Sequence, residues 1–191
     1  MTRSQYKRLE FQDIIIFTPL KHNDNRGVFF ENLNFVNFKN DLGISFQCVQ
    51  ENVSISKKNV LRGLHFQKGN HAQTKIIHVE KGSIFDVVVD IRTESNTYGK
   101  WISYILDDNK NENIIIPHGF AHGFLALEDN TKVSYKVDKS YNKKSECSII
   151  WNDPDLMIDW SVNNPILSKK DSEALSLEKN FNLRNFSIRD S

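Results

Sequence analysis

Residues 59–67, NVLRGLHFQ, place a cation and a histidine inside an apolar run that otherwise has the composition of a β-strand. Arg62 and His65 are costly to place beside a hydrophobic core unless they have a partner or a function. Strict alternation would send the two side chains to opposite faces, but Gly63 between them permits a β-bulge. We therefore expect a bulge at Gly63 and both side chains in one cavity. The alternative is a buried His65 bonded to the backbone and an Arg62 on the rim.

Two further polar side chains lie on predicted strands. Residues 131–137 alternate so that Tyr135 shares a face with Val133 and Val137, and we expect that face to point inward. An ordinary core tyrosine fits the same pattern. Lys75 alternates with Gln73 and Ile77, which also fits a solvated face at a sheet edge. The alternation by itself leaves both alternatives open.

Two polar patterns have a plain structural explanation as well as a functional one. In residues 46–56, Gln50, Asn52 and Ser54 lie on one face of a predicted strand. Such a face is usually solvated surface, unless it lines a cavity. Near the C-terminus, Ser168 with Asp171 three residues later predicts a helix N-cap. This gives Asp171 a structural role whether or not it has another.

The predicted elements are mainly short strands. Turn residues recur every 8–12 positions and bound about ten strands, which favours an antiparallel sandwich or barrel. One helix is expected at residues 33–42, ended by Gly43, and a turn-rich segment at residues 22–27 is expected to precede a short strand at residues 28–31. We expect one domain over residues 1–191, with the barrel core at about 45–150 and residues 151–191 packed on its outside.

Composition excludes several classes of protein. The 191 residues are 39% hydrophobic and 26% charged, as in an ordinary globular domain. Lys plus Arg is 25 and Asp plus Glu is 24, so a net charge of +1 offers no field for nucleic acid or an acidic membrane. Cys48 and Cys147 have no CxxC companion, which predicts neither a zinc site nor a disulfide framework. No signal peptide or membrane span is apparent, and we expect a cytoplasmic protein.

Taken in order, the motifs resemble one known family, over roughly residues 11–172. They are DNRGVFFE, VQEN, VLRGLHFQ, AQTK, DVVVDIR, IPHGFAHGF, SYKV, DP and ILSKKD. The succession is similar to the dTDP-4-dehydrorhamnose 3,5-epimerases, enzymes of dTDP-L-rhamnose and polysaccharide biosynthesis. The resemblance implies a mainly β, cupin-type double-stranded β-helix (jelly-roll barrel) with a few short peripheral helices, a homodimer, and a small-molecule nucleotide-sugar substrate. It implies a cofactor-independent isomerase that inverts C3, C5 or both beside a C4 ketone.

The resemblance also implies the catalytic groups. His65 matches the residue that acts as the base. A histidine suits this role, because a free pKa of about 6.5 leaves an imidazole mostly neutral at pH 7. Asp171 matches the carboxylate that orients it. Lys75 matches the cation near the enolate oxygen, and Tyr135 the acid on the opposite face of the sugar ring.

The remaining matches concern the substrate. Arg26 and Arg62 match diphosphate or sugar contacts, His122 matches a polar group of the pocket, and Tyr141 matches the residue that stacks on thymine. Further positions match substrate or nucleotide contacts: Phe29, Glu31, Gln50, Asn52, Glu146 and Lys170. Stacking accepts any base, so the pattern does not distinguish dTDP from GDP.

Alternatives from other classes remain open. Pro117, Gly119 and His122 follow a pattern that resembles the second metal motif of cupins. A cupin metal site usually begins with His-x-His, whereas His65-Phe66-Gln67 offers one histidine, so we expect no metal and no cofactor. A metal-dependent cupin and a cupin that only binds sugar nucleotides are the distant alternatives. Val53 stands where many family members have histidine, which leaves the identity of the sugar, including GDP-linked hexoses or heptoses, open.

Overall fold

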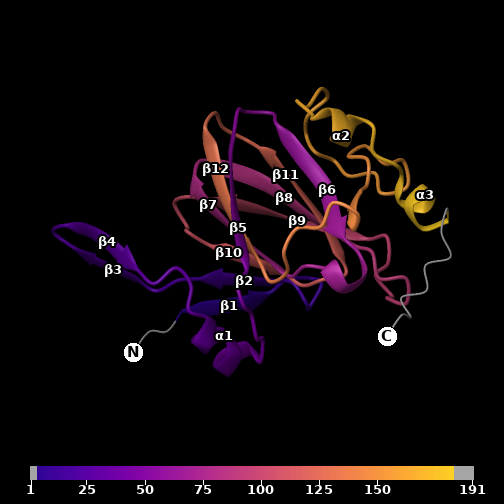
Figure 1. The fold of residues 1–191 in the computed structure, drawn as a ribbon. Helices are drawn as coiled ribbons and strands as arrows, with labels where there is room; N and C mark the ends of the chain where they lie inside the picture. The colour runs from indigo at the N-terminus through magenta and orange to yellow at the C-terminus, as the bar shows by residue number, and fades with distance from the viewer. Residues whose placement is uncertain (1–3, 183–191) are drawn as a thin grey trace.

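The computed structural model describes residues 4–182, which form two antiparallel sheets, a separate hairpin and short helices (Figure 1). The larger sheet has six strands. Their order across the sheet is β1 (Gln5–Arg8), β2 (Ile15–Thr18), β10 (Asn113–Ile116), β7 (Lys75–Lys81), β12 (Thr131–Val137) and β5 (Gln50–Ser56). This sheet takes in β1 and β2, which precede the range 45–150 expected for the barrel core.

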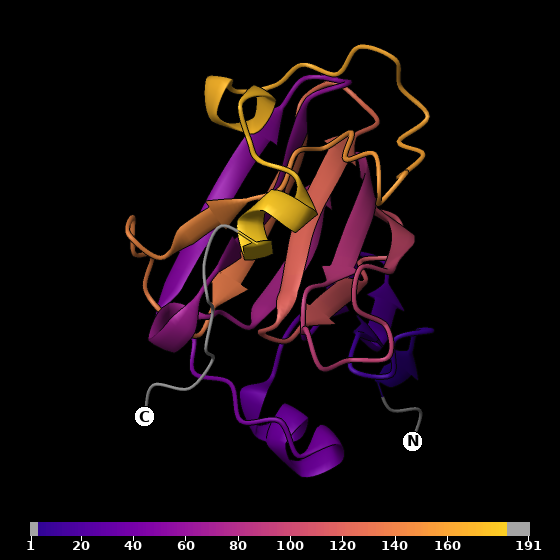
Figure 2. The same cartoon turned by 90° about the vertical axis from the view of Figure 1, so that its right-hand side faces the viewer.

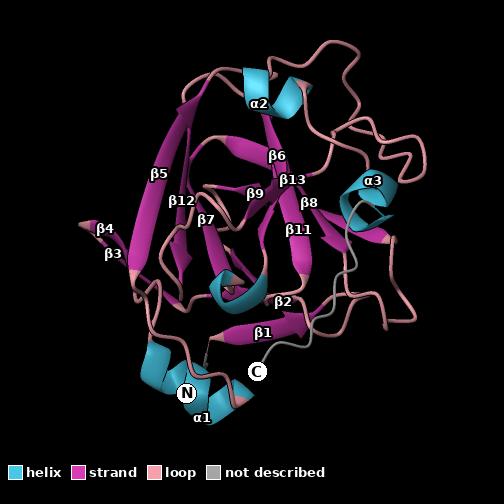
Figure 3. Ribbon diagram, turned by 45° about the vertical axis from the view of Figure 1, so that its right-hand side comes forward, coloured by secondary structure: helices cyan, strands magenta, loops and turns pink. Residues whose placement is uncertain are grey.

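The second sheet has five strands and faces the first (Figure 3). Its order is β13 (Glu146–Ser148), β6 (Leu61–Gln67), β11 (Phe120–Ala126), β8 (Ser83–Asp90) and β9 (Trp101–Asp107). A core of fully buried aliphatic side chains, including Ile77, Val79 and Val88, fills the space between the sheets. The mainly β, antiparallel fold predicted from the turn spacing is confirmed. Its driving force is the removal of these side chains from water.

The bulge predicted at Gly63 is present. Between the paired positions His65↔His122 and Arg62↔Phe124, β6 has one residue more than β11. Gly63 has φ +135°, and its Cα lies so close to Gly123 that an added Cβ would be 2.5 Å from the Gly123 Cα. The bulge lets Arg62 and His65 line the same cavity, as expected.

The helix predicted at residues 33–42 is α1 (Phe35–Leu42), which packs on the outer face of the six-stranded sheet. Asn34 caps its first turn by accepting hydrogen bonds from the Val36 and Asn37 N–H groups. Gly43 ends it in the left-handed conformation, with φ 69°. The Phe38 side chain is fully buried beneath the helix and fixes it to the sheet.

The segment expected to be turn-rich, residues 22–27, has its turn at residues 25–26 and is otherwise strand, whereas the strand expected at residues 28–31 is present. β3 (Lys21–Asp24) and β4 (Gly27–Phe30) pair as a hairpin, and Figure 1 shows this arm projecting away from the two sheets. The prediction was wrong for β3 because polar residues suit a two-stranded ribbon exposed on both faces, where no apolar alternation is required. Phe29, which pairs with His22 in this hairpin, is 72% exposed.

The C-terminal segment crosses the five-stranded sheet (Figure 2) and carries α2 (Lys169–Ser172) and α3 (Leu177–Asn182). A 3₁₀ turn, η1 (Gly69–His71), precedes β7. The strands β1 and β13 and the helix α3 were not predicted. Of the tail expected on the outside, residues 183–191 lie beyond the described part of the chain. Among the helices of residues 4–182, none has the length and apolar character needed to cross a bilayer.

The close approach of β6 and β11 predicts that any side chain larger than that of glycine at position 63 destabilises the fold. The variant Gly63→Ala should lower the free energy of unfolding by about 1–3 kcal/mol more than Gly27→Ala, because only the first adds overpacking to the positive-φ strain. Gly27 is the matched control, since its φ is +125° and nothing lies within 4 Å of an added Cβ. Denaturant unfolding measures both losses, and equal losses would contradict the close approach.

Candidate active site

A cavity of about 490 Å³ opens between the two sheets and is bordered by α2. All four residues assigned to catalysis line it: His65, Lys75, Tyr135 and Asp171. Seven of the ten residues assigned to the substrate also line it: Gln50, Asn52, Arg62, His122, Tyr141, Glu146 and Lys170. The polar face of β5 therefore borders a cavity and is not simply solvated surface.

A histidine–carboxylate pair forms one wall. His65 Nε2 lies 2.5 Å from Asp171 Oδ1, although the two residues are 106 positions apart in the sequence. Burial lowers the pKa of His65 below its usual value, while the Asp171 carboxylate acts to raise it. The imidazole is therefore neutral at pH 7. With Nε2–H donated to the carboxylate, Nδ1 carries the lone pair that can accept a proton.

Asp171 is buried, and α2 holds it in place. The N-cap predicted at Ser168 is confirmed, because the Asp171 N–H donates to Ser168 Oγ over 3.1 Å. Burial acts to raise the pKa of Asp171, but the hydrogen bonds from His65 and Ser168 and the charge of Lys170 lower it below its usual value. The carboxylate is ionised beside a neutral imidazole.

Lys75 supplies a positive charge inside the cavity. Its Nζ donates to the backbone carbonyl of His65 over 3.1 Å. Burial lowers the pKa of Lys75 to about 8, and the carboxylates of Asp86 and Glu146 act against that shift. Near neutral pH the side chain is mostly an ammonium ion. The solvated edge position left open by the sequence is not observed, because Lys75 is buried.

Tyr135 reaches the cavity from the opposite sheet. It lies on β12 between Asn52 of β5 and Ile77 of β7, while His65 lies on β6. Burial raises the pKa of the Tyr135 phenol, and the charge of Arg62 acts to lower it. The hydroxyl is therefore protonated at neutral pH and able to donate a proton. The inward face predicted from alternation is present.

His122 is paired with a carboxylate that the sequence did not single out. Its Nε2 lies 2.7 Å from Oδ2 of Asp86, and both side chains are buried. Asp86 lies on β8, and the signals in the sequence were its place on an alternating strand and its position as the first residue of the motif DVVVDIR. Across the described residues 4–182, no group of three or more His, Cys, Asp or Glu side chains is arranged to hold a metal ion.

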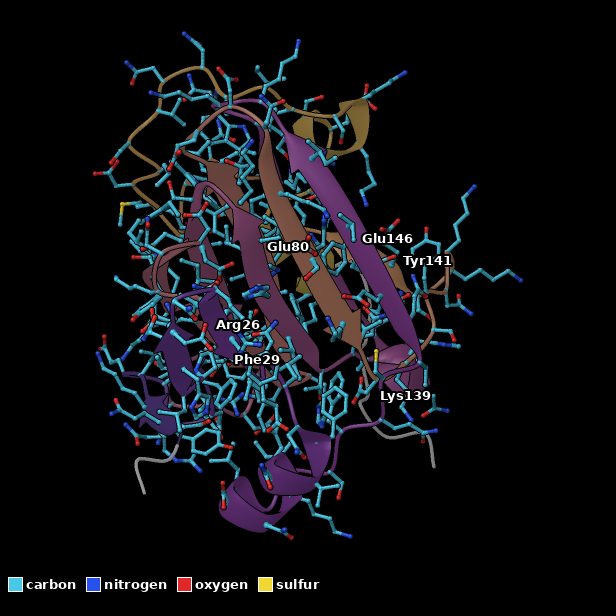
Figure 4. The ribbon with its side chains drawn as sticks, turned by 90° about the vertical axis from the view of Figure 1, so that its left-hand side faces the viewer. Arg26, Phe29, Glu80, Lys139, Tyr141 and Glu146 are labelled. Carbon is cyan, nitrogen blue, oxygen red and sulfur yellow. The ribbon has the colours of Figure 1, made fainter. Side chains whose placement is uncertain are left out.

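The mouth of the cavity is built by a network around Tyr141. Gln50 accepts the Tyr141 N–H over 3.0 Å, and the Tyr141 hydroxyl donates to Glu146 over 3.1 Å. Figure 4 labels Tyr141 and Glu146 next to each other. Lys170 Nζ lies 2.6 Å from the other oxygen of Glu146. Burial acts to raise the pKa of Glu146, but Lys170 and Tyr141 lower it overall. Tyr141 is 51% exposed, so a planar group can reach its side chain from solvent.

Arg62 and Gln67, both on β6, also line the cavity. The Arg62 Nε–H donates to Ser56 Oγ over 3.2 Å, which orients an exposed guanidinium at the cavity. Gln67 accepts the Asn142 N–H over 2.7 Å and so fixes the loop that carries Tyr141. Gln67 was quoted in the motif, but its contact with residue 142 could not be foreseen from spacing.

Three residues assigned to the substrate do not line this cavity. Arg26, Phe29 and Glu31 lie on or beside the arm, and Phe29 and Glu31 border a separate hollow next to α1. Arg26 is paired with Asp24 at 2.6 Å, as a residue flanking a turn often is. Figure 4 labels Arg26 and Phe29 apart from Tyr141 and Glu146. Within one chain, the arm does not contribute to the site.

Comparisons with known proteins agree with this geometry. Residues 8–179 match the family model described as dTDP-4-dehydrorhamnose 3,5-epimerase. The chain belongs to this family. It is 43% identical to the dTDP-4-dehydrorhamnose 3,5-epimerase of Escherichia coli K12 over 178 residues, covering 93% of this chain and 96% of that protein.

Solved structures of epimerases share the fold. The dTDP-4-dehydrorhamnose 3,5-epimerase of Elizabethkingia anophelis superposes with a TM-score of 0.88 at 39% identity, over 97% of this chain and 100% of the other. The Legionella pneumophila dTDP-6-deoxy-D-glucose-3,5-epimerase, in complex with dTDP-4-keto-L-rhamnose, gives 0.87 at 38% identity, over 92% and 94%. The epimerase family has the cupin-type barrel, so the predicted fold is confirmed, and this family member is an isomerase.

The pairing of His65 with Asp171 predicts the direction of a titration. Asp171→Asn should lower the pKa of His65 further, because the imidazolium loses the negative charge that stabilises it and protonates only at lower pH. NMR titration of the imidazole measures this. Glu173→Gln, at the exposed end of α2, is the control and should leave the titration unchanged. An unchanged or higher pKa in Asp171→Asn would contradict the pairing.

Proposed function

We propose that this family member converts a dTDP-4-keto-6-deoxy sugar by inverting C3 and C5, as in the formation of dTDP-4-dehydro-L-rhamnose. The observation that carries the proposal is the placement of a neutral imidazole and a protonated phenol on opposite sheets of one cavity. Inversion at carbon requires that a proton leave one face of the ring and another arrive on the opposite face. A base and an acid on opposite walls meet that requirement.

The base in this mechanism is His65. Its free ring nitrogen takes the proton from the carbon next to the ketone, and the imidazolium that forms is stabilised by Asp171 at 2.5 Å. Because burial disfavours the charged ring, the carboxylate matters most after proton transfer. Tyr135 then donates its proton to the other face of the enolate carbon, and solvent restores both groups.

The ammonium of Lys75 stabilises the enolate oxygen. A charge fixed before the reaction needs no reorganisation as the oxyanion develops, and one well-placed donor contributes about 3–4 kcal/mol. The hydrogen bond to the His65 carbonyl fixes Nζ on the same side of the cavity as the base. The positions next to the carbonyl of a 4-keto sugar are C3 and C5, so the same three groups serve both carbons.

The nucleotide is proposed to lie at the mouth. Arg62 and Lys170 offer cations for a diphosphate, and the exposed side chain of Tyr141 offers a surface for the base. Relatives that act on dTDP sugars support dTDP. A GDP-linked 4-keto hexose or heptose is the alternative. Since the ring of Tyr141 accepts either base, competition between dTDP and GDP decides between them.

The working protein is proposed to be a single-domain, cytoplasmic homodimer. Arg26, Phe29 and Glu31 were assigned to nucleotide binding by resemblance, yet they lie on an arm that does not reach the cavity of its own chain. A second copy related by a two-fold axis would exchange arms reciprocally. The exposed Phe29 and Arg26 support this arrangement. A nucleotide-sugar substrate, and the absence of a disulfide between Cys48 and Cys147 in the described part of the chain, support a reducing cytoplasm.

Isotope exchange tests the reaction. In D₂O the protein should place deuterium at C3 and C5 of the 4-keto sugar. His65→Ala and Tyr135→Phe should each reduce turnover by about 10²–10⁴-fold, because each removes one proton-transfer group. Tyr104→Phe is the control, since that hydroxyl bonds to Glu112 and does not line the cavity. Absence of exchange with dTDP- and GDP-linked 4-keto sugars would contradict the proposal.

Mixed dimers test the exchange of arms. A mixture of Arg26→Ala and His65→Ala chains should recover about a quarter of the wild-type activity, because half of the dimers are mixed and each of these has one intact site. His65→Ala mixed with Tyr135→Phe is the control. Both of these substitutions lie in the barrel, so no mixed dimer gains an intact site. Equal activity in the two mixtures would contradict a shared site.

A further inference from the structure

Ser168 is the one hydroxyl that touches the Asp171 carboxylate in the described structure, and its hydrogen bonds define its role. The Asp171 N–H donates to Ser168 Oγ over 3.1 Å, and Ser168 Oγ lies 2.8 Å from Asp171 Oδ2. A serine hydroxyl has one proton and two lone pairs. Since the backbone N–H already occupies a lone pair and an ionised carboxylate only accepts, the hydroxyl proton must be donated to Oδ2.

Both oxygens of Asp171 are consequently held. His65 occupies Oδ1 at 2.5 Å and Ser168 occupies Oδ2 at 2.8 Å, so rotation of the carboxylate would break two hydrogen bonds. An ordinary capping box differs, because there the acidic side chain bonds back to the N–H of the capping residue. Here the side chain of Asp171 is directed to the imidazole and to the Ser168 hydroxyl.

The backbone gives α2 limited support of its own, because the helix is a single turn and so short a helix is not stable alone. Backbone contacts fix the chain on both sides of α2, before it at Ile166 and after it at Leu175. Ile166 forms a bridge with Val60, just before β6. Leu175 accepts the Ile150 N–H over 2.9 Å. Between these two anchors, Ser168 bonds to the carboxylate itself.

We propose that Ser168 is a positioning residue for the His65–Asp171 pair, whose hydroxyl aims the carboxylate at the imidazole and stabilises its ionised form. This inference rests on the proposed function for its kinetic consequence. Charged groups from each neighbouring element also face the pair: Lys170 of α2, Lys75 of β7 and Glu146 of β13. None of these three lies at hydrogen-bond distance from Asp171 Oδ2 within the part of the chain that is described.

Substitutions separate this role from helix capping. Ser168→Gly removes the donated proton but weakens an N-cap by only a few tenths of a kcal/mol. Ser168→Thr keeps both the cap and the donor. Ser172→Ala is the matched control, since it removes a hydroxyl from the same helix whose bond runs to the Lys169 carbonyl at the surface.

We expect Ser168→Gly to reduce kcat by about 10- to 100-fold with little change in KM, the range seen when a bond that orients a functional side chain is lost. The acid limb of its pH profile, which follows protonation of His65, should move to lower pH, because the imidazolium loses part of the stabilisation that an aimed carboxylate gives it. Ser168→Thr and Ser172→Ala should keep the wild-type values. If Ser168→Gly matches Ser172→Ala in both kcat and acid limb, the serine only caps the helix and the inference is wrong.

A second measurement does not depend on turnover. The titration of His65 in Ser168→Gly should shift to lower pH relative to Ser172→Ala when followed by NMR, because a carboxylate that is no longer aimed at the ring stabilises the imidazolium less. If the wild-type protein shows no exchange on any 4-keto sugar, the proposed function fails while this titration still decides the role of Ser168. A shift of the His65 titration to lower pH supports the positioning role, and an unchanged titration or a shift to higher pH overturns it.

Discussion

The hydrogen bond between His65 and Asp171 is the constraint on which the rest of the site depends. It joins a strand inside the five-stranded sheet to a single helical turn near the end of the chain. A neutral ring beside an ionised carboxylate requires that water be largely excluded and that the carboxylate be stabilised by other donors. The barrel supplies the first condition, and Ser168 with Lys170 supplies the second.

The same buried environment sets opposite protonation states on the two walls. Burial disfavours every charged form, so it lowers the pKa of His65 and of Lys75 and raises the pKa of Tyr135. The result at neutral pH is one group ready to accept a proton and another ready to donate. Lys75 differs because its normal pKa is far above 7, and a value of about 8 still leaves it charged. Burial therefore contributes to the protonation state of all three groups: the base, the acid and the cation.

Features of the fold and the site that depend on neighbouring residues in the sequence could be predicted, whereas contacts between residues far apart in the sequence could not. Alternation placed Tyr135 inward, and the glycine between Arg62 and His65 predicted the bulge, because both signals are local. The partnership of His122 with Asp86 was missed, since 36 positions separate them and neither spacing nor composition records a contact across strands. The first strand of the arm, β3, was taken for part of a turn because a ribbon exposed on both faces has no apolar period to detect.

The position of Asp171 so late in the sequence has a consequence for how the protein is made. Every strand of both sheets precedes residue 149, so the barrel can assemble on a nascent chain before α2 has been synthesised. Such a chain would present a formed cavity, with its imidazole in place but without the carboxylate. Competence is thus conferred by the last part of translation, because a product that ends before α2 would lack the carboxylate and also Leu177, a buried member of the core on the five-stranded sheet.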